Sequence, residues 1–118
     1  MTGTINSELM RGSLNMMILS ILAEESQYGY LMQQKLRDAS REMVDLKAGT
    51  LYPILHRLEA DKFIRSRWDK STGRKRKWYD ITAAGKKQLS KQAIEWQTYV
   101  ECIQNLLGQV NLSPKPAC

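Results

Sequence analysis

Residues 48–81 read AGTLYPILHRLEADKFIRSRWDKSTGRKRKWYDI, in which a helical pattern is followed at once by two β-prone runs. Four apolar residues of the first part recur at steps of three, one and three, as on one face of a helix: Leu51, Ile54, Leu55 and Leu58. This spacing predicts a helix from about residue 48 to residue 61. Pro53 should then lie in or near the first turn, because farther inside a helix its ring collides with the carbonyl four residues earlier.

The second part of this stretch predicts a β-hairpin. Residues 63–68 and 75–81 alternate β-prone with charged side chains, and residues 69–74 contain small polar residues suited to a turn. Four consecutive cations lie at the tip and at the start of the second strand: Arg74, Lys75, Arg76 and Lys77. Because successive side chains of a strand point to opposite faces, the two arginines are expected on one face and the two lysines on the other.

The rest of the chain predicts three further helices. Apolar residues recur with helical spacing over residues 5–24 and 30–39, which are separated by a break at residues 26–29. Thr82 is placed to cap a long last helix over residues 83–110. The order helix, helix, helix, hairpin, long helix predicts a mainly α fold with a two-stranded β wing, a winged helix-turn-helix followed by a long C-terminal helix.

Positive charge is confined to the middle of the chain. Residues 47–91 carry thirteen basic and four acidic side chains, whereas the segments before and after them are slightly acidic and the whole chain has a net charge of +6. A basic block of this kind indicates a surface that meets nucleic acid, because each cation placed on a phosphate releases counterions. The alternative is solvated charge kept for solubility, which would more naturally be spread along the chain.

The predicted winged helix and the basic block together indicate double-stranded DNA as the partner. In this motif the third helix lies in the major groove with its N-terminal residues at the base edges. The candidate DNA-binding residues on and beside the third helix are Lys47, Gly49, Thr50, Tyr52, Pro53, His56 and Arg57. The other candidates are Tyr30 and Lys35 on the second helix and Gly73, Arg74, Lys75 and Arg76 on the hairpin. Tyr52 can equally be a core aromatic residue, and His56 a plain surface histidine.

The last helix carries an apolar seam that predicts a homodimer. Its residues recur at alternating steps of four and three: Leu89, Ala93, Trp96, Val100, Ile103, Leu107 and Val110. A 3.5-residue repeat held for three heptads keeps one stripe facing a partner helix. The alternative is a helix buried only within its own chain. We therefore expect a winged-helix DNA-binding domain over residues 1–82, a dimerisation helix over 83–110 and a flexible tail over 111–118.

Several motifs resemble the PadR family of bacterial repressors. The motifs are Gly29-Tyr30, Gly49-Thr50-Leu51-Tyr52-Pro53, Leu55-His56-Arg57-Leu58-Glu59, Gly73-Arg74-Lys75-Arg76-Lys77-Trp78-Tyr79 and Thr82-Ala83-Ala84-Gly85. The resemblance implies a winged-helix homodimer on a pseudo-palindromic operator, released by a small aromatic effector. The single C-terminal helix resembles the short subfamily, some drug-sensing members of which pair a Trp across the two-fold axis.

Trp96 falls on the position of that paired Trp. The resemblance therefore implies a pocket for a planar aromatic effector lined by Met10, Met17, Trp96, Val100 and Ile103, although the same residues could pack as a solid dimer core. One departure from the family is Asp61-Lys62, where an acidic residue is usually followed by Gly. A residue other than Gly takes a left-handed helix cap less easily, which leaves the angle of the wing open.

Other classes of protein have weaker support in the sequence. A winged helix used for protein contacts would expose an apolar or acidic third helix, and an enzyme would need a phosphate loop, metal-ligand spacing or a His beside a nucleophile. We expect no catalytic residues, no cofactor and no metal site, and we expect Cys102 and Cys118 to be reduced thiols. No secretory signal or apolar run of about 20 residues is found, which predicts a cytoplasmic protein without a membrane span.

Overall fold

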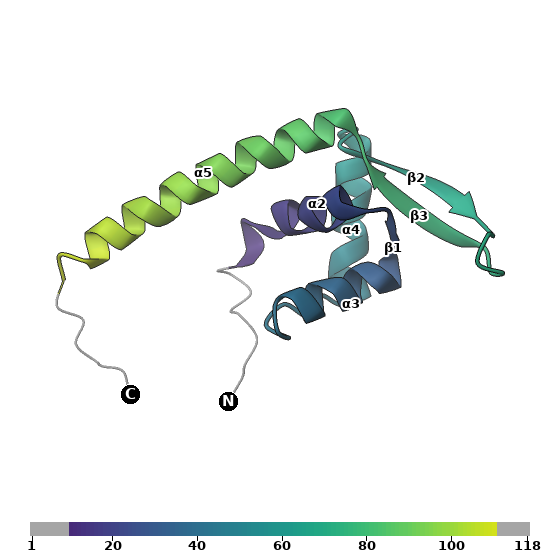
Figure 1. Cartoon of the computed structure of the whole chain (residues 1–118), viewed down its shortest axis with the longest axis horizontal. Coiled ribbons are helices and arrows are strands. Elements are labelled where there is room, and N and C mark those ends of the chain that lie inside the picture. Colours follow the sequence, from purple (N-terminus) through teal and green to yellow (C-terminus); the bar gives the residue numbers. More distant parts are fainter. Residues whose placement is uncertain (1–9, 111–118) are drawn as a thin grey trace.

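The computed structural model describes residues 10–110 and has the winged helix-turn-helix fold with a long C-terminal helix that the sequence predicts. Its helices are α2 (Leu14–Glu24), α3 (Gly29–Ala39), α4 (Ala48–Ala60) and α5 (Ala83–Leu107), and its strands are β1 (Gln27–Tyr28), β2 (Ile64–Asp69) and β3 (Arg76–Ile81). Helices α2, α3 and α4 lie together below the first part of α5 (Figure 1). The β2–β3 hairpin and the C-terminal part of α5 project from this group in opposite directions.

The core is formed by the inner faces of the three short helices and the base of the sheet. Leu19 of α2, Met32 of α3, Leu51 and Leu55 of α4 and Tyr79 of β3 are almost completely buried. The apolar stripe predicted for α4 is therefore the face that holds this helix on the core, and the opposite face of α4 remains free.

The sheet contains a third strand that the sequence does not reveal. Strand β1 pairs antiparallel with β3, so the sheet has the order β1–β3–β2 rather than being a two-stranded wing. Gln27 pairs with Tyr79 and Tyr28 with Trp78. A two-residue strand is too short to show an alternating pattern, and its pairing with residues about 50 positions later has no local signal.

Two helix boundaries and the position of Pro53 differ from the predictions. Helix α2 begins at Leu14, because the chain turns at Gly12 and Ser13, where the Ser13 hydroxyl donates to the Met10 carbonyl at 3.0 Å. Pro53 is the sixth residue of α4 and so lies in the second turn. Because proline has no amide hydrogen, the carbonyl of Gly49 lacks its helical hydrogen bond, but Gly49 is exposed and water can donate to it instead. Helix α5 ends at Leu107, before the poor helix former Gly108. Residues 5–9 of the first predicted helix and the predicted tail 111–118 lie outside the described residues.

The junction of α4, the wing and α5 is fixed by Lys62 and Thr82. Lys62 adopts the left-handed conformation (φ 66°) at the position where the PadR resemblance leads one to expect Gly, at a cost of roughly 1–2 kcal/mol. The Thr82 hydroxyl donates to the Lys62 carbonyl at 2.7 Å and accepts from the Gly85 amide at 3.0 Å. Thr82 is therefore the helix cap that the sequence predicts. A Cβ on Gly85 would collide with the Phe63 carbonyl, so this position requires Gly.

Candidate nucleic-acid interface

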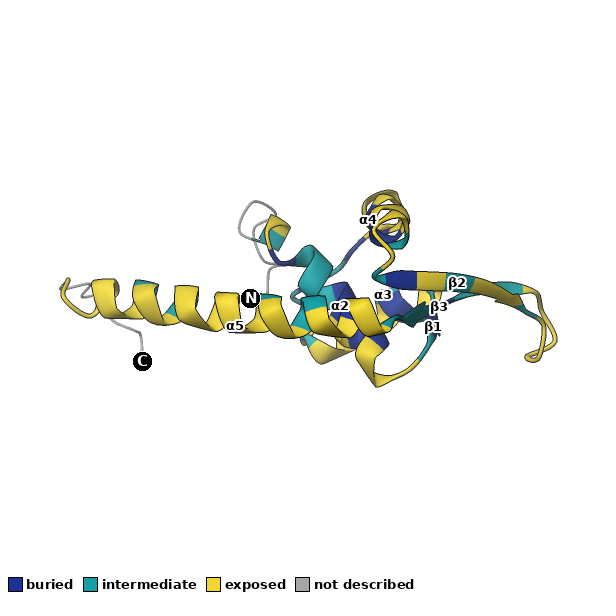
Figure 2. Cartoon of the chain, turned by 90° about the horizontal axis from the view of Figure 1, so that it is seen from above, coloured by how far each residue is buried: buried dark blue, intermediate teal, exposed yellow. Residues whose placement is uncertain are grey.

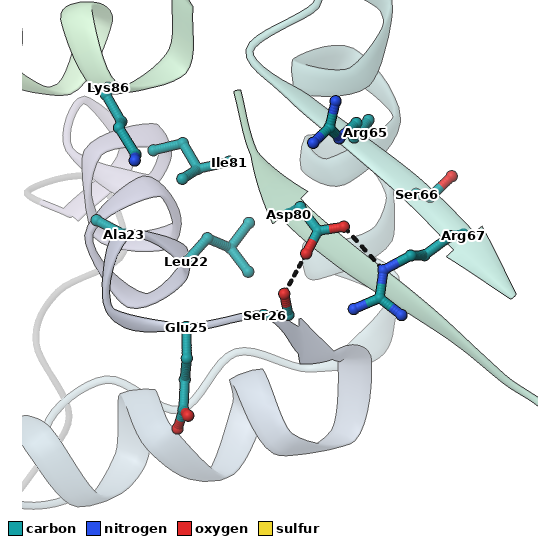
Figure 3. A pocket seen from close by; sticks show the side chains of 10 residues that line it. All are labelled: Leu22, Ala23, Glu25, Ser26, Arg65, Ser66, Arg67, Asp80, Ile81 and Lys86. Carbon is teal, nitrogen blue, oxygen red and sulfur yellow. Dashed lines mark hydrogen bonds and ion pairs between the residues drawn. The ribbon is translucent and has the colours of Figure 1, made fainter. Parts of the chain in front are cut away.

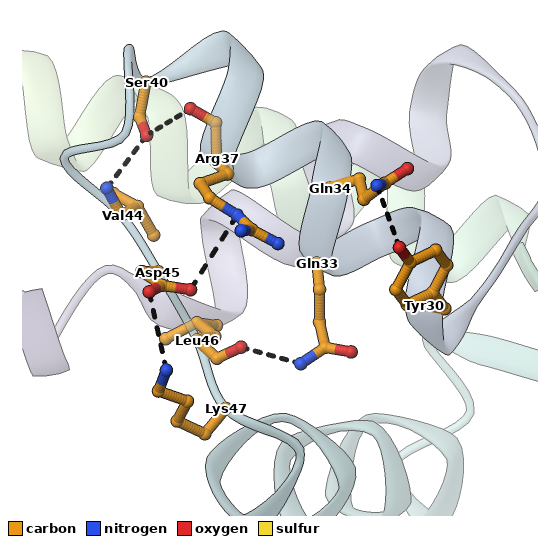
Figure 4. Close-up of polar contacts among 9 residues, drawn as sticks. All are labelled: Tyr30, Gln33, Gln34, Arg37, Ser40, Val44, Asp45, Leu46 and Lys47. Carbon is orange, nitrogen blue, oxygen red and sulfur yellow. Dashed lines mark hydrogen bonds and ion pairs between the residues drawn. The ribbon is translucent and has the colours of Figure 1, made fainter.

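The turn between α3 and α4 is held by contacts between side chains of α3 and residues of the turn (Figure 4). The Gln33 amide donates to the Leu46 carbonyl at 2.9 Å. The Asp45 carboxylate lies 3.9 Å from Arg37 Nε and 3.6 Å from Lys47 Nζ. These contacts fix the start of α4 relative to α3, which is the arrangement that a helix-turn-helix needs in order to present its second helix.

All candidates on and beside α4 lie on the outer surface. Lys47, Gly49, Thr50, Pro53, His56 and Arg57 are exposed. The sequence left open whether Tyr52 is a surface residue that binds DNA or a core aromatic residue, and the structure shows features of both. Its side chain is 37% exposed, yet a Cβ added at Gly29 would lie 2.7 Å from Tyr52 Cζ, so the ring packs directly on the start of α3. Tyr52 is thus both a surface residue and part of the contact between α3 and α4.

A groove of about 610 Å³ separates the start of α3 and the outer face of α4 from the wing. Its walls combine aromatic residues with cations: Tyr28, Gly29, Tyr30, Tyr52, Trp68, Arg74, Lys75, Arg76, Lys77 and Tyr79. Tyr30 is exposed, and its hydroxyl accepts a hydrogen bond from the Gln34 amide at 3.1 Å. Lys35 is not among the residues that line this groove, and its ammonium group pairs with Glu24 at 3.9 Å and Glu25 at 3.6 Å.

The basic residues of the wing divide between its two faces. Lys75 Nζ lies 5.2 Å from the ring of Trp68, and Lys77 Nζ lies 5.8 Å from the ring of Tyr79. On the other face Arg76 donates to the Tyr28 hydroxyl at 2.8 Å and lies 4.4 Å above that ring. Arg76 and the two lysines therefore lie on opposite faces, as expected, whereas Arg74 precedes the start of β3 and no contact assigns it to a face. Gly73 closes the tip with a φ of 87°, which a residue with a side chain adopts at a cost.

The far face of the wing is tied to the end of α2 through Asp80 (Figure 3). The Ser26 hydroxyl donates to Asp80, and Arg67 Nε donates to the same carboxylate at 3.1 Å. Arg67 also donates to Asp69 at 2.9 Å. Burial by itself would raise the pKa of Asp80, but the hydrogen bonds from Ser26 and Arg67 and the nearby guanidinium groups outweigh it, so the pKa lies below its ordinary value. Sequence reasoning missed this network, because its members come from three separate segments.

Replacing Asp80 with Asn is expected to lower the melting temperature by roughly 5 °C at neutral pH. The depressed pKa means that the carboxylate stabilises the fold above the pKa of about 4 that it has in the unfolded chain, and that this stability is lost as the pH falls through the lower folded-state pKa. The difference in melting temperature between Asp80→Asn and wild type should therefore shrink toward zero in acid. The matched control is Asp61→Asn, because Asp61 is exposed and makes no ion pair within residues 10–110. A difference that persists unchanged below pH 3 would contradict the role given to Asp80.

The seam residues of α5 differ widely in burial. Leu89 packs against the core, Val100 and Ile103 are half-buried, and Trp96 is 40% exposed. Beyond the point where α5 leaves the other helices, exposed residues cover most of its surface (Figure 2). Ala93, Leu107 and Val110 are exposed as well, and Val110 lies past the end of the helix.

Of the five expected pocket residues, Trp96 lines the cavity found beside α5 within residues 10–110, and the other four do not line it. A cavity of about 190 Å³ lies between the start of α2 and α5, lined by Gly12, Met16, Gln92, Glu95, Trp96 and Tyr99. Met16 thus occupies the place expected for Met17, whereas Met10 and Met17 pack against the core. The rings of Trp96 and Tyr99 lie 5.9 Å apart.

A helix-turn-helix with a basic wing and a long projecting helix is the architecture of a winged-helix transcriptional regulator. Residues 18–91 match the transcriptional regulator PadR-like family, and the chain belongs to that family. A transcriptional regulator of Mycobacterium tuberculosis is 37% identical over 84 residues, which cover 71% of this chain and 76% of the relative.

Solved structures of other regulators have the same fold. A transcriptional regulator from Clostridium thermocellum is 32% identical with a TM-score of 0.78, covering 84% of this chain and 97% of that one. A PadR family regulator from Eggerthella lenta is 35% identical with a TM-score of 0.76, covering 85% and 86% of the two chains.

None of the helices within residues 10–110 has the length and apolar character needed to cross a membrane.

Proposed function

We propose that the chain is a cytoplasmic repressor without catalytic activity that binds a pseudo-palindromic DNA operator as a homodimer. In this proposal residues 1–82 bind DNA and residues 83–110 dimerise. The groove between α4 and the wing carries the proposal. Tyr52, on the exposed face of α4, lines it together with the four cations of the wing, and Thr50 is exposed near the start of the same helix. Helix α4 would read bases in the major groove while the wing holds the neighbouring backbone.

The dimer is supported by the apolar residues that α5 leaves uncovered. Ile94, Tyr99 and Leu106 are each more than half exposed, in addition to the exposed members of the seam. Several large exposed apolar side chains on one helix are characteristic of a protein interface. A two-fold dimer would also place two copies of α4 on one face of the duplex, about one helical turn apart.

Selection of binding duplexes from a random-sequence pool tests the proposed function. We expect an enriched site with inverted symmetry and half-sites about 10 base pairs apart. A pool that yields no enriched sequence, or no bound duplex, would instead favour the alternative of a winged helix used for protein contacts.

We also propose a planar aromatic effector at Trp96. The cavity beside Trp96 in one chain is smaller than the ~300–1,000 Å³ of typical ligand sites, but two such cavities facing each other across the two-fold axis would reach that range. Trp96 and Tyr99 offer rings for stacking, and Glu95 favours a cationic ligand. The alternative is a regulator with a solid dimer core and no effector.

A planar aromatic effector is expected to quench Trp fluorescence and to weaken operator binding together, because the two equilibria are linked. Each compound in the panel is first shown not to bind the duplex alone. The Trp96→Ala variant should lose at least about tenfold in effector affinity, since neither indole of a two-fold site remains to stack on the ligand. A solid dimer core is indicated if the compounds bind this variant as tightly as wild type, or bind wild type without changing its affinity for DNA.

A further inference from the structure

Trp68 is a large aromatic residue for which the fold supplies no packing role. It lies on β2 opposite Lys77 of β3 and is 61% exposed. Ser66 of β2 and its pairing partner Tyr79 of β3 share this face of the sheet, because each lies two positions from Trp68 or Lys77. The Ser66 hydroxyl donates to Glu59 of α4 at 2.6 Å, so this is the face that looks toward α4.

Two lysines of the hairpin lie beside Trp68. Lys75 Nζ lies 5.2 Å from the indole ring, and Lys77 projects from the same face of the hairpin. Tyr52 lines the opposite wall. Trp68 therefore stands exposed between cations at the place where, under the proposed function, one strand of the DNA backbone crosses between α4 and the wing.

We propose that Trp68 is an apolar DNA contact, its indole packing on the deoxyribose of that strand while Lys75 and Lys77 bind the phosphates on either side. This inference rests on the proposed function and adds to it a residue that gives affinity without charge. A deoxyribose presents an apolar face between two phosphates, which matches an indole flanked by two ammonium groups. Trp68 lies on the wall of the groove and not in the turn at residues 70–75, so it is placed to pack beside the strand and not to wedge between base steps.

Trp78 is the internal comparison for Trp68. It lies on the adjacent strand but on the far face of the hairpin, in edge contact with Tyr28 at a centroid distance of 5.0 Å. It is half-buried and does not line the groove. The two indoles therefore share one hairpin, and only Trp68 faces the expected path of the DNA.

The first test measures the affinity of Trp68→Ala for the selected operator and for a random-sequence duplex over a range of salt concentrations. We expect both affinities to fall about tenfold, the usual scale for truncating a packed interface aromatic. The two should fall by the same factor, because packing on a sugar carries no sequence information. The slope of log affinity against log salt should stay at the wild-type value, because every cation that binds a phosphate is still present.

Two variants accompany this measurement. Trp68→Phe should recover most of the affinity, since it restores an aromatic face. Arg65→Ala is the control for a general effect on the strand, because Arg65 is exposed on the same strand but on the far face, and it should keep wild-type affinity. Melting curves of all three confirm that the hairpin still folds.

The second test measures the fluorescence emission of each indole separately. A chain that keeps only Trp68 (Trp78→Phe and Trp96→Phe) should change its emission when the duplex is added, whereas a chain that keeps only Trp78 should not. Wild-type affinity in a folded Trp68→Ala variant overturns the inference, and so does a weaker affinity accompanied by a lower salt slope, which would mean that Trp68 acts only by holding Lys75. If the wild-type chain binds no duplex at all, the proposed function itself fails and this inference falls with it.

Discussion

Replacing both Val100 and Ile103 by Glu is expected to turn the proposed dimer into monomers and to weaken operator binding by about 10²-fold or more. Both residues lie on the seam of α5 and are half-buried within one chain, so a partner helix would bury them further. Two carboxylates per chain would then face two others across the two-fold axis in an apolar contact. Operator binding weakens because two half-sites held by one dimer reinforce each other and two separate monomers do not. Sedimentation measures the oligomeric state, and a mobility-shift titration measures the affinity.

The control adds the same charge beside the seam. Gln97 and Gln104 are exposed on α5 and each follows a seam residue by one position, outside the 3.5-residue stripe. Gln97→Glu with Gln104→Glu should therefore remain dimeric and bind the operator as wild type does. If the Val100→Glu, Ile103→Glu variant still sediments as a dimer, α5 does not dimerise through this seam.

The helices and the hairpin could be predicted because each carries its own local pattern. The stripe from Leu51 to Leu58 requires only that α4 pack on something apolar, and the cap at Thr82 depends on the next three residues. Strand β1 could not be predicted in the same way, because its hydrogen bonds go to Trp78 and Tyr79. The left-handed turn at Lys62 was indicated only by the PadR resemblance, which leads one to expect Gly there, since nothing local favours that conformation for a lysine.

In the candidate site, too, some features could be predicted from local sequence and others could not. The exposed face of α4 and the run of cations at the wing tip are contiguous in sequence, so they could be found there. The surroundings of Lys35 could not be predicted, because the two carboxylates that pair with its ammonium group, Glu24 and Glu25, lie outside its own helix. The position of Trp68 depends on the register of β2 against β3, which only the structure shows.

Replacing Arg74, Lys75 and Arg76 by Gln in one variant is expected to flatten the slope of log affinity against log salt by up to about three units. This is roughly one unit for each phosphate that is no longer bound. Arg76 stacks on Tyr28, so the larger share should come from Arg74 and Lys75. At low salt the same variant should bind both operator and random duplex more weakly. A change of Thr50 or Tyr52 should act differently, altering the preferred sequence while leaving the slope in place.

The matched control removes the same charge from another part of the molecule. Lys86, Lys87 and Lys91 are exposed on the first half of α5 and do not line the groove. Their replacement with Gln lowers the net charge of the chain by the same three units. Comparison of the two triple variants therefore separates phosphate contacts at the wing from the attraction of a positively charged protein to DNA in general.

DNA binding through the groove between α4 and the wing is tested most directly by the slope of log affinity against log salt for the wild type and the two triple variants. We predict a steep negative slope for the wild type, the same slope for the α5 variant, and a clearly flatter slope for the wing variant. A wing variant that keeps the full wild-type slope, or a wild-type chain whose affinity does not depend on salt, would contradict this mode of binding.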